Sequence, residues 1–216
     1  EQAAEQLLAL AQALDLSGED RALRSRYGIT DAPTPVKGGA ELLKQFLIAR
    51  RLVEAGVRCV TLAFSQWPLE RMSRGGYNWD WHKDCFGEAR GALPLFDLGL
   101  SALIQDLDQR GLLEDIAVVA WGEFGRTPKV NKAAGRDHWN YCYSLMLIGG
   151  GMKPGLIYGA SDKIGAFPAD NPLVPGDIIS TMYHALGIRH DRLLRDQFNR
   201  PYRLVPAGNV VHALLA

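Results

Sequence analysis

Two histidines and three carboxylates lie in loops where their spacing suits a divalent metal ion. Asp80 and His82 are two residues apart, so in an extended segment both side chains project to the same side. A carboxylate and an imidazole placed in this way can share one ion, because zinc, manganese and iron accept mixed nitrogen and oxygen ligands. The alternative is that Asp80 caps a turn and His82 is solvated.

A second polar loop, residues 122–140, contains the other candidates. Glu123 directly follows an apolar run, where a metal-binding or catalytic carboxylate is expected. Asp137 and His138 precede another apolar run and could ligate the same ion; alternatively, they share a hydrogen bond without metal. Their expected convergence at one end of a sheet favours the metal interpretation. The predicted ligands are therefore Asp80, His82, Glu123, Asp137 and His138, and the predicted cofactor is a divalent ion (Zn, Mn, Ca or Mg).

Two arginines in the same loop are predicted to bind substrate. Arg126 and Arg136 each carry a guanidinium that can pair with two oxygens of an anionic group. For Arg126, a salt bridge within the protein is the alternative interpretation. The chain has no dinucleotide-binding or phosphate-binding glycine loop and no Gly-x-Ser-x-Gly nucleophile elbow. Its serines and threonines offer no nucleophile with an adjacent base, so the catalytic residue is not predicted.

Alternating helices and strands must position these loops. Apolar spacing predicts helices over residues 1–26, with a break near Ser17 and Gly18, and also over 40–55, 88–110 and 175–186. Apolar runs predict strands at residues 57–64, 116–121 and 143–148, with a short edge strand at 156–158. This order is typical of an α/β fold with a mainly parallel sheet in three layers, α/β/α. In such sheets, ligands bind beyond the carboxyl ends of the strands.

The long loop at residues 66–85 is rich in aromatic side chains, namely Trp67, Tyr77, Trp79 and Trp81. A loop of this length is usually functional, and its aromatic content argues against disorder. The rings could stack on a glycan or a protein partner, which would make the chain a non-catalytic binding module. Alternatively, they pack the loop onto the rest of the fold.

The composition excludes some partners. The chain has 216 residues and a formal net charge of zero, which gives no electrostatic reason to expect nucleic acid or an anionic membrane. Its apolar stretches are too short for a membrane span, and no signal peptide is recognisable in these residues. The sequence makes no prediction of oligomeric state.

Five motifs carry a resemblance to a known family: residues 50–57, 78–80, 122–128, 135–139 and 158–162. They are similar to the domain of unknown function 1501 (DUF1501) family, which is abundant in planctomycetes and is placed with alkaline phosphatases and sulfatases. The resemblance extends from about Tyr27 to the C-terminus. It implies an alkaline-phosphatase-like domain over residues 27–216, incomplete at its N-terminal side, preceded by a helical segment at 1–26.

The resemblance also implies a function. It suggests a metal-dependent hydrolase of phosphate or sulfate esters, with a small anionic ester as substrate and an exported or periplasmic location. Asp80, His82 and His138 resemble ligands of one metal site, and Glu123 resembles the acid of a neighbouring site. Phe124 stands where the superfamily often has His or Asn, which puts a complete second site in doubt. The superfamily's nucleophile comes from an N-terminal region that this chain does not resemble, so the nucleophile is expected to be absent.

Overall fold

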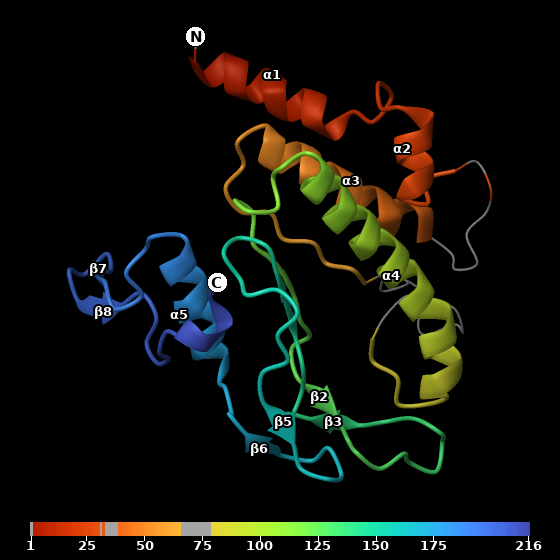
Figure 1. Ribbon diagram of the computed structural model, residues 1–216, viewed down its shortest axis with the longest axis vertical. Coiled ribbons are helices and arrows are strands. Elements are labelled where there is room, and N and C mark those ends of the chain that lie inside the picture. Colours follow the sequence, from red (N-terminus) through yellow and green to blue (C-terminus); the bar gives the residue numbers. More distant parts are fainter. Residues whose placement is uncertain (1, 31, 33–38, 66–78) are drawn as a thin grey trace. The chain divides into compact units, whose positions relative to one another are not determined.

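The computed structural model describes residues 2–30, 32, 39–65 and 79–216 (Figure 1). The chain divides into two compact units. The first unit contains residues 1–110 together with residues 131–135, and the second unit contains residues 111–130 and 136–216.

Four helices make up the described part of the first unit: α1 (Gln2–Leu14), α2 (Arg21–Arg26), α3 (Gly39–Glu54) and α4 (Cys85–Gln109). The α2 helix begins after Asp20, whose carboxylate accepts hydrogen bonds from the backbone N–H groups of Ala22 and Leu23. The α3 helix is followed by Gly56 at φ +89°, a conformation that glycine adopts without strain. The start of α2 and the end of α3 therefore have local causes in the sequence.

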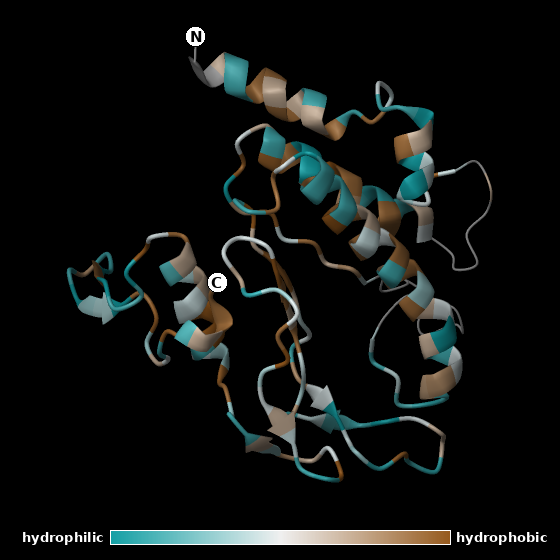
Figure 2. Cartoon of the chain, in the orientation of Figure 1, coloured by the Kyte–Doolittle hydropathy of each residue, from teal (hydrophilic) through white to brown (hydrophobic). Residues whose placement is uncertain are grey.

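The α3 and α4 helices pack against each other and form the core of the first unit. Gly99 makes room for the ring of Phe46, since a Cβ at this position would overlap that ring. Both helices alternate hydrophobic and hydrophilic residues along their length (Figure 2). Burial of one large apolar side chain stabilises a fold by about 1.5–3 kcal/mol, so this contact is a principal source of stability. The buried apolar residues include Leu42, Leu43, Phe46, Leu47, Leu95, Leu103 and Leu107.

The second unit contains short strands in antiparallel pairs. They are β1 (Val118–Ala120) with β4 (Met146–Ile148), β2 (Gly125–Arg126) with β3 (His138–Trp139), β5 (Ala160–Ser161) with β6 (Pro168–Asp170), and β7 (Leu193–Arg195) with β8 (Pro201–Arg203). It also contains α5 (Pro175–Ala185) and a 3₁₀ turn, η1 (His212–Leu214). Asp177 in the first turn of α5 accepts hydrogen bonds from the N–H groups of Val174 and Asn209 and so fastens the C-terminal segment to this helix.

The predicted three-layer α/β/α fold with a mainly parallel sheet is wrong. Each pair of strands in the described part of the chain is antiparallel, and each sheet has two strands. A parallel pair needs a crossover, usually a helix, whereas the chain between β1 and β4 contains turns and the β2–β3 pair. The predicted strands at residues 57–64 and 156–158 do not form, and a strand occurs at Ala160–Ser161 instead.

The helix predictions are confirmed with small shifts of their ends. The segment 1–26 forms α1 and α2 with a turn at Ser17 and Gly18, and the segments predicted at 40–55, 88–110 and 175–186 form α3, α4 and α5. The predicted strands at 116–121 and 143–148 are present in shortened form as β1 and β4. Helical periodicity is a local signal, whereas the direction of strand pairing depends on distant residues.

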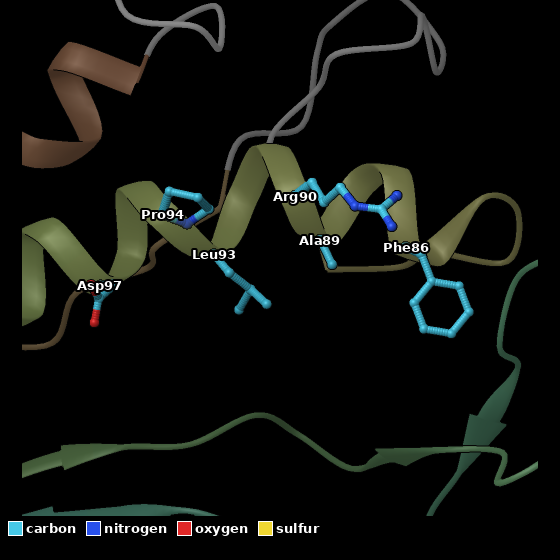
Figure 3. Close-up of a pocket in the computed structure, with 6 residues that line it drawn as sticks. All are labelled: Phe86, Ala89, Arg90, Leu93, Pro94 and Asp97. Carbon is cyan, nitrogen blue, oxygen red and sulfur yellow. The ribbon is translucent and has the colours of Figure 1, made fainter.

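One surface feature of the first unit is a groove along the N-terminal half of α4. It is lined by Phe86, Ala89, Arg90, Leu93, Pro94 and Asp97 (Figure 3). All six residues come from one helix, and none is a predicted metal ligand. Among the described residues, no helix has the length and apolarity to cross a membrane.

Candidate metal centre

Asp80 and His82 lie just before the N-terminus of α4 and contact each other. His82 Nε2 is 3.0 Å from Asp80 Oδ1, and the backbone N–H of His82 donates to the carbonyl oxygen of Asp80. Both side chains are partly exposed, at 41% for His82 and 24% for Asp80. The N-terminus of α4 is capped by Asp84, whose carboxylate accepts a hydrogen bond from Gly87 N–H. The Asp80 carboxylate lies beside the His82 imidazole.

Two tryptophans flank Asp80 in the chain and anchor this segment. The Trp79 ring is 5.2 Å from the Trp81 ring and 5.9 Å from Phe96 of α4, measured between centroids. Trp79 also donates from Nε1 to the carbonyl oxygen of Phe64 at 2.7 Å. Trp79 therefore packs the segment at 79–82 against α4 and Phe64, and Trp81 packs on Trp79. The other predicted aromatic residues, Trp67 and Tyr77, lie outside the described residues.

The segment 131–135 lies against the residues that follow His82, within the first unit. Asp84 N–H donates to Ala133 O at 3.0 Å, and Cys85 N–H donates to Ala134 O at 2.8 Å. Lys83 and Ala134 also form an isolated antiparallel bridge. These contacts place the chain that leads into His138 next to the segment that carries Asp80 and His82.

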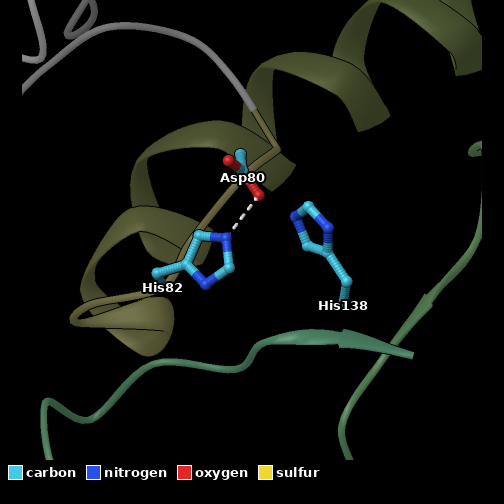
Figure 4. A group of neighbouring side chains, drawn as sticks. All are labelled: Asp80, His82 and His138. Atoms are coloured by element: carbon cyan, nitrogen blue, oxygen red, sulfur yellow. Dashed lines mark ion pairs between the residues drawn. The ribbon is translucent and has the colours of Figure 1, made fainter.

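Asp80, His82 and His138 form a group that could hold a metal ion. Each offers one ligand atom, and these atoms all lie within 4.8 Å of one another (Figure 4). In a tetrahedral site with ligands at 2.0–2.2 Å from the ion, ligand atoms are separated by roughly 3.4 Å.

Arg126 lies opposite His138 in the β2–β3 ladder. Directly paired residues project from the same face of a two-stranded ladder, with Cβ atoms about 4.5–5.5 Å apart. The Phe124 ring contacts both functional groups: its centroid is 4.7 Å from the His138 ring and 5.6 Å from Arg126 Cζ. A positive charge is therefore held near the candidate ligand His138 by local β structure.

Glu123 and Asp137 lie outside the group of three. Glu123 Oε1 is 3.5 Å from Arg126 Nη2, and the Glu123 side chain is 60% exposed. The salt-bridge interpretation of Arg126 therefore describes one of its contacts. The backbone of Asp137 closes the loop, since its N–H donates to Thr127 Oγ1 and its carbonyl oxygen accepts from Thr127 N–H.

Arg136 has a structural role in the same loop. Its Nη1 donates to the carbonyl oxygens of Thr127 and Pro128, at 2.9 and 3.0 Å. A guanidinium engaged in this way has fewer donors left for a substrate. Sequence reasoning did not identify Phe124 as the residue that packs on His138, because nothing in the spacing of the two residues signals a contact across a hairpin.

Comparison with known protein families gives a match over nearly the whole chain. The family described as "protein of unknown function (DUF1501)" matches residues 1–215, so the match includes the two N-terminal helices as well as the motifs downstream of Tyr27. No curated protein and no solved structure matches the chain.

Proposed function

Since the chain belongs to the DUF1501 family, for which no function is described, we propose a function from the site itself: a metal-dependent hydrolase of phosphate or sulfate esters. The observation that carries this proposal is the convergence of one carboxylate and two imidazoles, from Asp80, His82 and His138, within 4.8 Å. Three protein ligands leave a further coordination position open, which is the arrangement of catalytic rather than structural zinc sites.

The donor set favours a transition metal over calcium or magnesium. Imidazole nitrogen suits zinc, manganese and iron, whereas calcium and magnesium select oxygen ligands. Two of the three donors are imidazoles, so we propose zinc or manganese. Such an ion would act as a Lewis acid that polarises an ester oxygen and makes water more acidic.

The residues around the ligands support an anionic substrate. Arg126 projects from the same face of the ladder as His138, and its guanidinium can pair with two oxygens of a phosphoryl or sulfuryl group. Binding would require Arg126 to exchange its 3.5 Å contact with the exposed Glu123, which is inexpensive in water. The motif resemblance to phosphatases and sulfatases supports the same substrate class. Because no side-chain nucleophile is predicted in this chain, water would be the nucleophile. Its oxygen would add to phosphorus or sulfur, the bond to the ester oxygen would break, and the alcohol would leave with one proton of the water.

Metal content tests the proposal most directly. After loading with zinc or manganese and extensive dialysis, the parent protein is expected to retain about one equivalent of metal, measured by mass spectrometry of the dissolved element. His138→Ala and Asp80→Ala should lose it, because each removes a ligand. His184→Ala is the matched control, since His184 is an exposed histidine outside the group. Absence of metal from the loaded parent would overturn the proposal.

Turnover separates the hydrolase from a metal-dependent binding module. With p-nitrophenyl phosphate and p-nitrophenyl sulfate, the loaded parent should release p-nitrophenol faster than the chelated protein, and His138→Ala should match the chelated protein. Stoichiometric metal without turnover of either ester would contradict the hydrolase proposal and leave only a metal-binding function.

A further inference from the structure

We infer that Asn131 is a positioning residue for the metal centre: its side-chain amide joins the backbone of His82 to the turn that leads into His138. This inference rests on the proposed metal site. The amide oxygen Oδ1 accepts hydrogen bonds from the N–H groups of Ala133 and Gly135, at 2.9 and 3.0 Å. The amide nitrogen Nδ2 donates to the carbonyl oxygen of His82 at 3.1 Å. One side chain thus closes the turn at residues 131–135 and ties it to a predicted ligand.

The backbone of the turn shows why it can lie so close to His82. Ala134 has φ +58°, and Asn131 N–H donates to Gly135 O, so the chain reverses tightly. Gly135 is buried, and a Cβ at this position would overlap the backbone of His82 and Lys83. Only glycine permits this approach without displacement of the turn.

The short chain between Gly135 and His138 limits how far His138 can lie from this contact. His138 follows Gly135 by three residues, and each residue spans at most about 3.6 Å, so the Cα of His138 lies within roughly 11 Å of a point fixed against His82. Asn131 holds the turn together with the backbone hydrogen bonds from Asp84 and Cys85, and it alone among these contacts bonds to His82 itself. Loss of its side chain would loosen the turn beside His82 and widen the range of positions open to His138. Groups that orient ligands without touching the ion typically contribute about 10- to 100-fold in metal affinity.

An asparagine is required because both ends of the amide are used. In Asn131→Asp, a carboxylate oxygen would face the carbonyl oxygen of His82, which replaces an attraction with a repulsion. In Asn131→Ser, the hydroxyl can still accept from Ala133 N–H, but it is too short to reach His82. The two variants therefore remove the same contact to His82 and differ in how much of the turn they retain.

The test is a titration of the metal-free protein with Zn²⁺ by calorimetry and with Co²⁺ by visible absorption. We expect Asn131→Asp and Asn131→Ser to bind zinc at least about 10-fold more weakly than the parent, with an altered Co²⁺ ligand-field spectrum and an unchanged far-ultraviolet circular dichroism spectrum. Asn171→Asp is the control, since Asn171 is exposed and donates to its neighbour Asp170. It should bind like the parent.

The possible results distinguish the two proposals. If the parent binds zinc and both Asn131 variants match it in affinity and Co²⁺ spectrum, the positioning role of Asn131 is wrong and the metal site stands. If the parent itself binds no zinc, the proposed function fails and the inference fails with it. If Asn131→Asp does not fold, Asn131→Ser alone decides the question by the same two readouts.

Discussion

Asp106 and Asp80 belong to the same unit of the molecule, and each lies beside basic side chains, yet their surroundings differ in kind. Asp106 is 3% exposed and its partners are Arg50, Arg110 and Tyr27. The side chain of Asp80 is 24% exposed, and it contacts the imidazole of His82. Arginine stays protonated at any physiological pH, whereas a neutral imidazole offers a lone pair to a metal ion. The type of partner therefore distinguishes a carboxylate that stabilises the fold from one that could bind a metal ion.

The Asp106 cluster leaves little capacity for a ligand. Arg110 Nε donates to Oδ1 at 2.8 Å, Tyr27 donates its hydroxyl hydrogen to Oδ2 at 2.9 Å, and Arg50 Nε lies 2.9 Å from Oδ2. Arg50 is 2% exposed and also pairs with Glu19 and Glu54. A buried, paired cluster of this kind is costly to break, because removal of one partner leaves an uncompensated charge.

The largest expected effect follows from breaking this cluster. We predict that Arg50→Met lowers the free energy of unfolding by about 3–5 kcal/mol, because Asp106 and Glu19 would lose a buried cation. Urea denaturation followed by circular dichroism measures the change. The matched control is Lys44→Met on the same helix, which breaks the exposed pair of Lys44 with Glu41 and should cost less than about 0.5 kcal/mol. Equal losses in the two variants would contradict the distinction between buried and exposed pairs.

Addition of metal should stabilise the protein through Asp80, His82 and His138 and not through the Asp106 cluster. We predict that zinc at 100 times its dissociation constant raises the free energy of unfolding of the parent by about 2.7 kcal/mol, because the ion binds the folded state alone. His82→Ala should lose this stabilisation, and Arg50→Met should keep it, provided that it remains folded. Thermal unfolding with and without zinc provides the measurement. A zinc effect that disappears in Arg50→Met but persists in His82→Ala would reverse the assignment of the two clusters.

The sequence predicted the helices well because each rests on local signals. The apolar stripes that include Leu43 and Leu103, and the glycine at position 56, mark helix faces and ends without reference to the rest of the chain. Strand pairing could not be inferred in this way. The apolar runs that became β1 and β4 suit either direction of pairing, and the choice depends on the chain between them.

Part of the candidate site was predicted from the sequence, but the structure brings its residues together in a different way from the one predicted. Asp80, His82 and His138 were expected to meet at the carboxyl ends of parallel strands, and that sheet does not form. They are grouped because residues 131–135 bond to the segment after His82. Asn131 was not identified, since an asparagine in a polar loop resembles any turn residue until the position of its distant partner is known.

Arg126 offers a further test of the contrast between the two clusters, because it is an arginine near the candidate metal centre and not in the buried Asp106 cluster. We predict that Arg126→Ala changes the free energy of unfolding by less than about 1 kcal/mol, because its contact with Glu123 is partly exposed and 3.5 Å long. Its KM for p-nitrophenyl phosphate should rise roughly 10-fold with zinc content unchanged, since a charge-assisted hydrogen bond to substrate is lost. Steady-state kinetics and metal analysis provide both values. A variant that lost its zinc would show that Arg126 supports the ligands rather than the substrate.

The smallest expected effect is a change with pH in the stability that Asp106 contributes. Burial would raise the pKa of Asp106, but hydrogen bonds from Arg110 and Tyr27 and the charge of Arg50 outweigh it and lower the pKa below the usual value. A carboxyl whose pKa is lower in the folded state stabilises the fold above the pKa of the unfolded chain, about 3.9, and this contribution is lost as the pH falls through the folded-state pKa.

We therefore predict that the stability advantage of the parent over Asp106→Asn is constant at pH 5–7 and narrows below about pH 4. The limiting slope for a single carboxyl is about 1.4 kcal/mol per pH unit. Urea denaturation of both proteins between pH 7 and pH 3 measures the difference directly, and other carboxyls cancel because the two chains share them. An advantage that stayed constant down to pH 3 would mean that the arginines do not stabilise the ionised form of Asp106, and the contrast with Asp80 would then rest on burial alone.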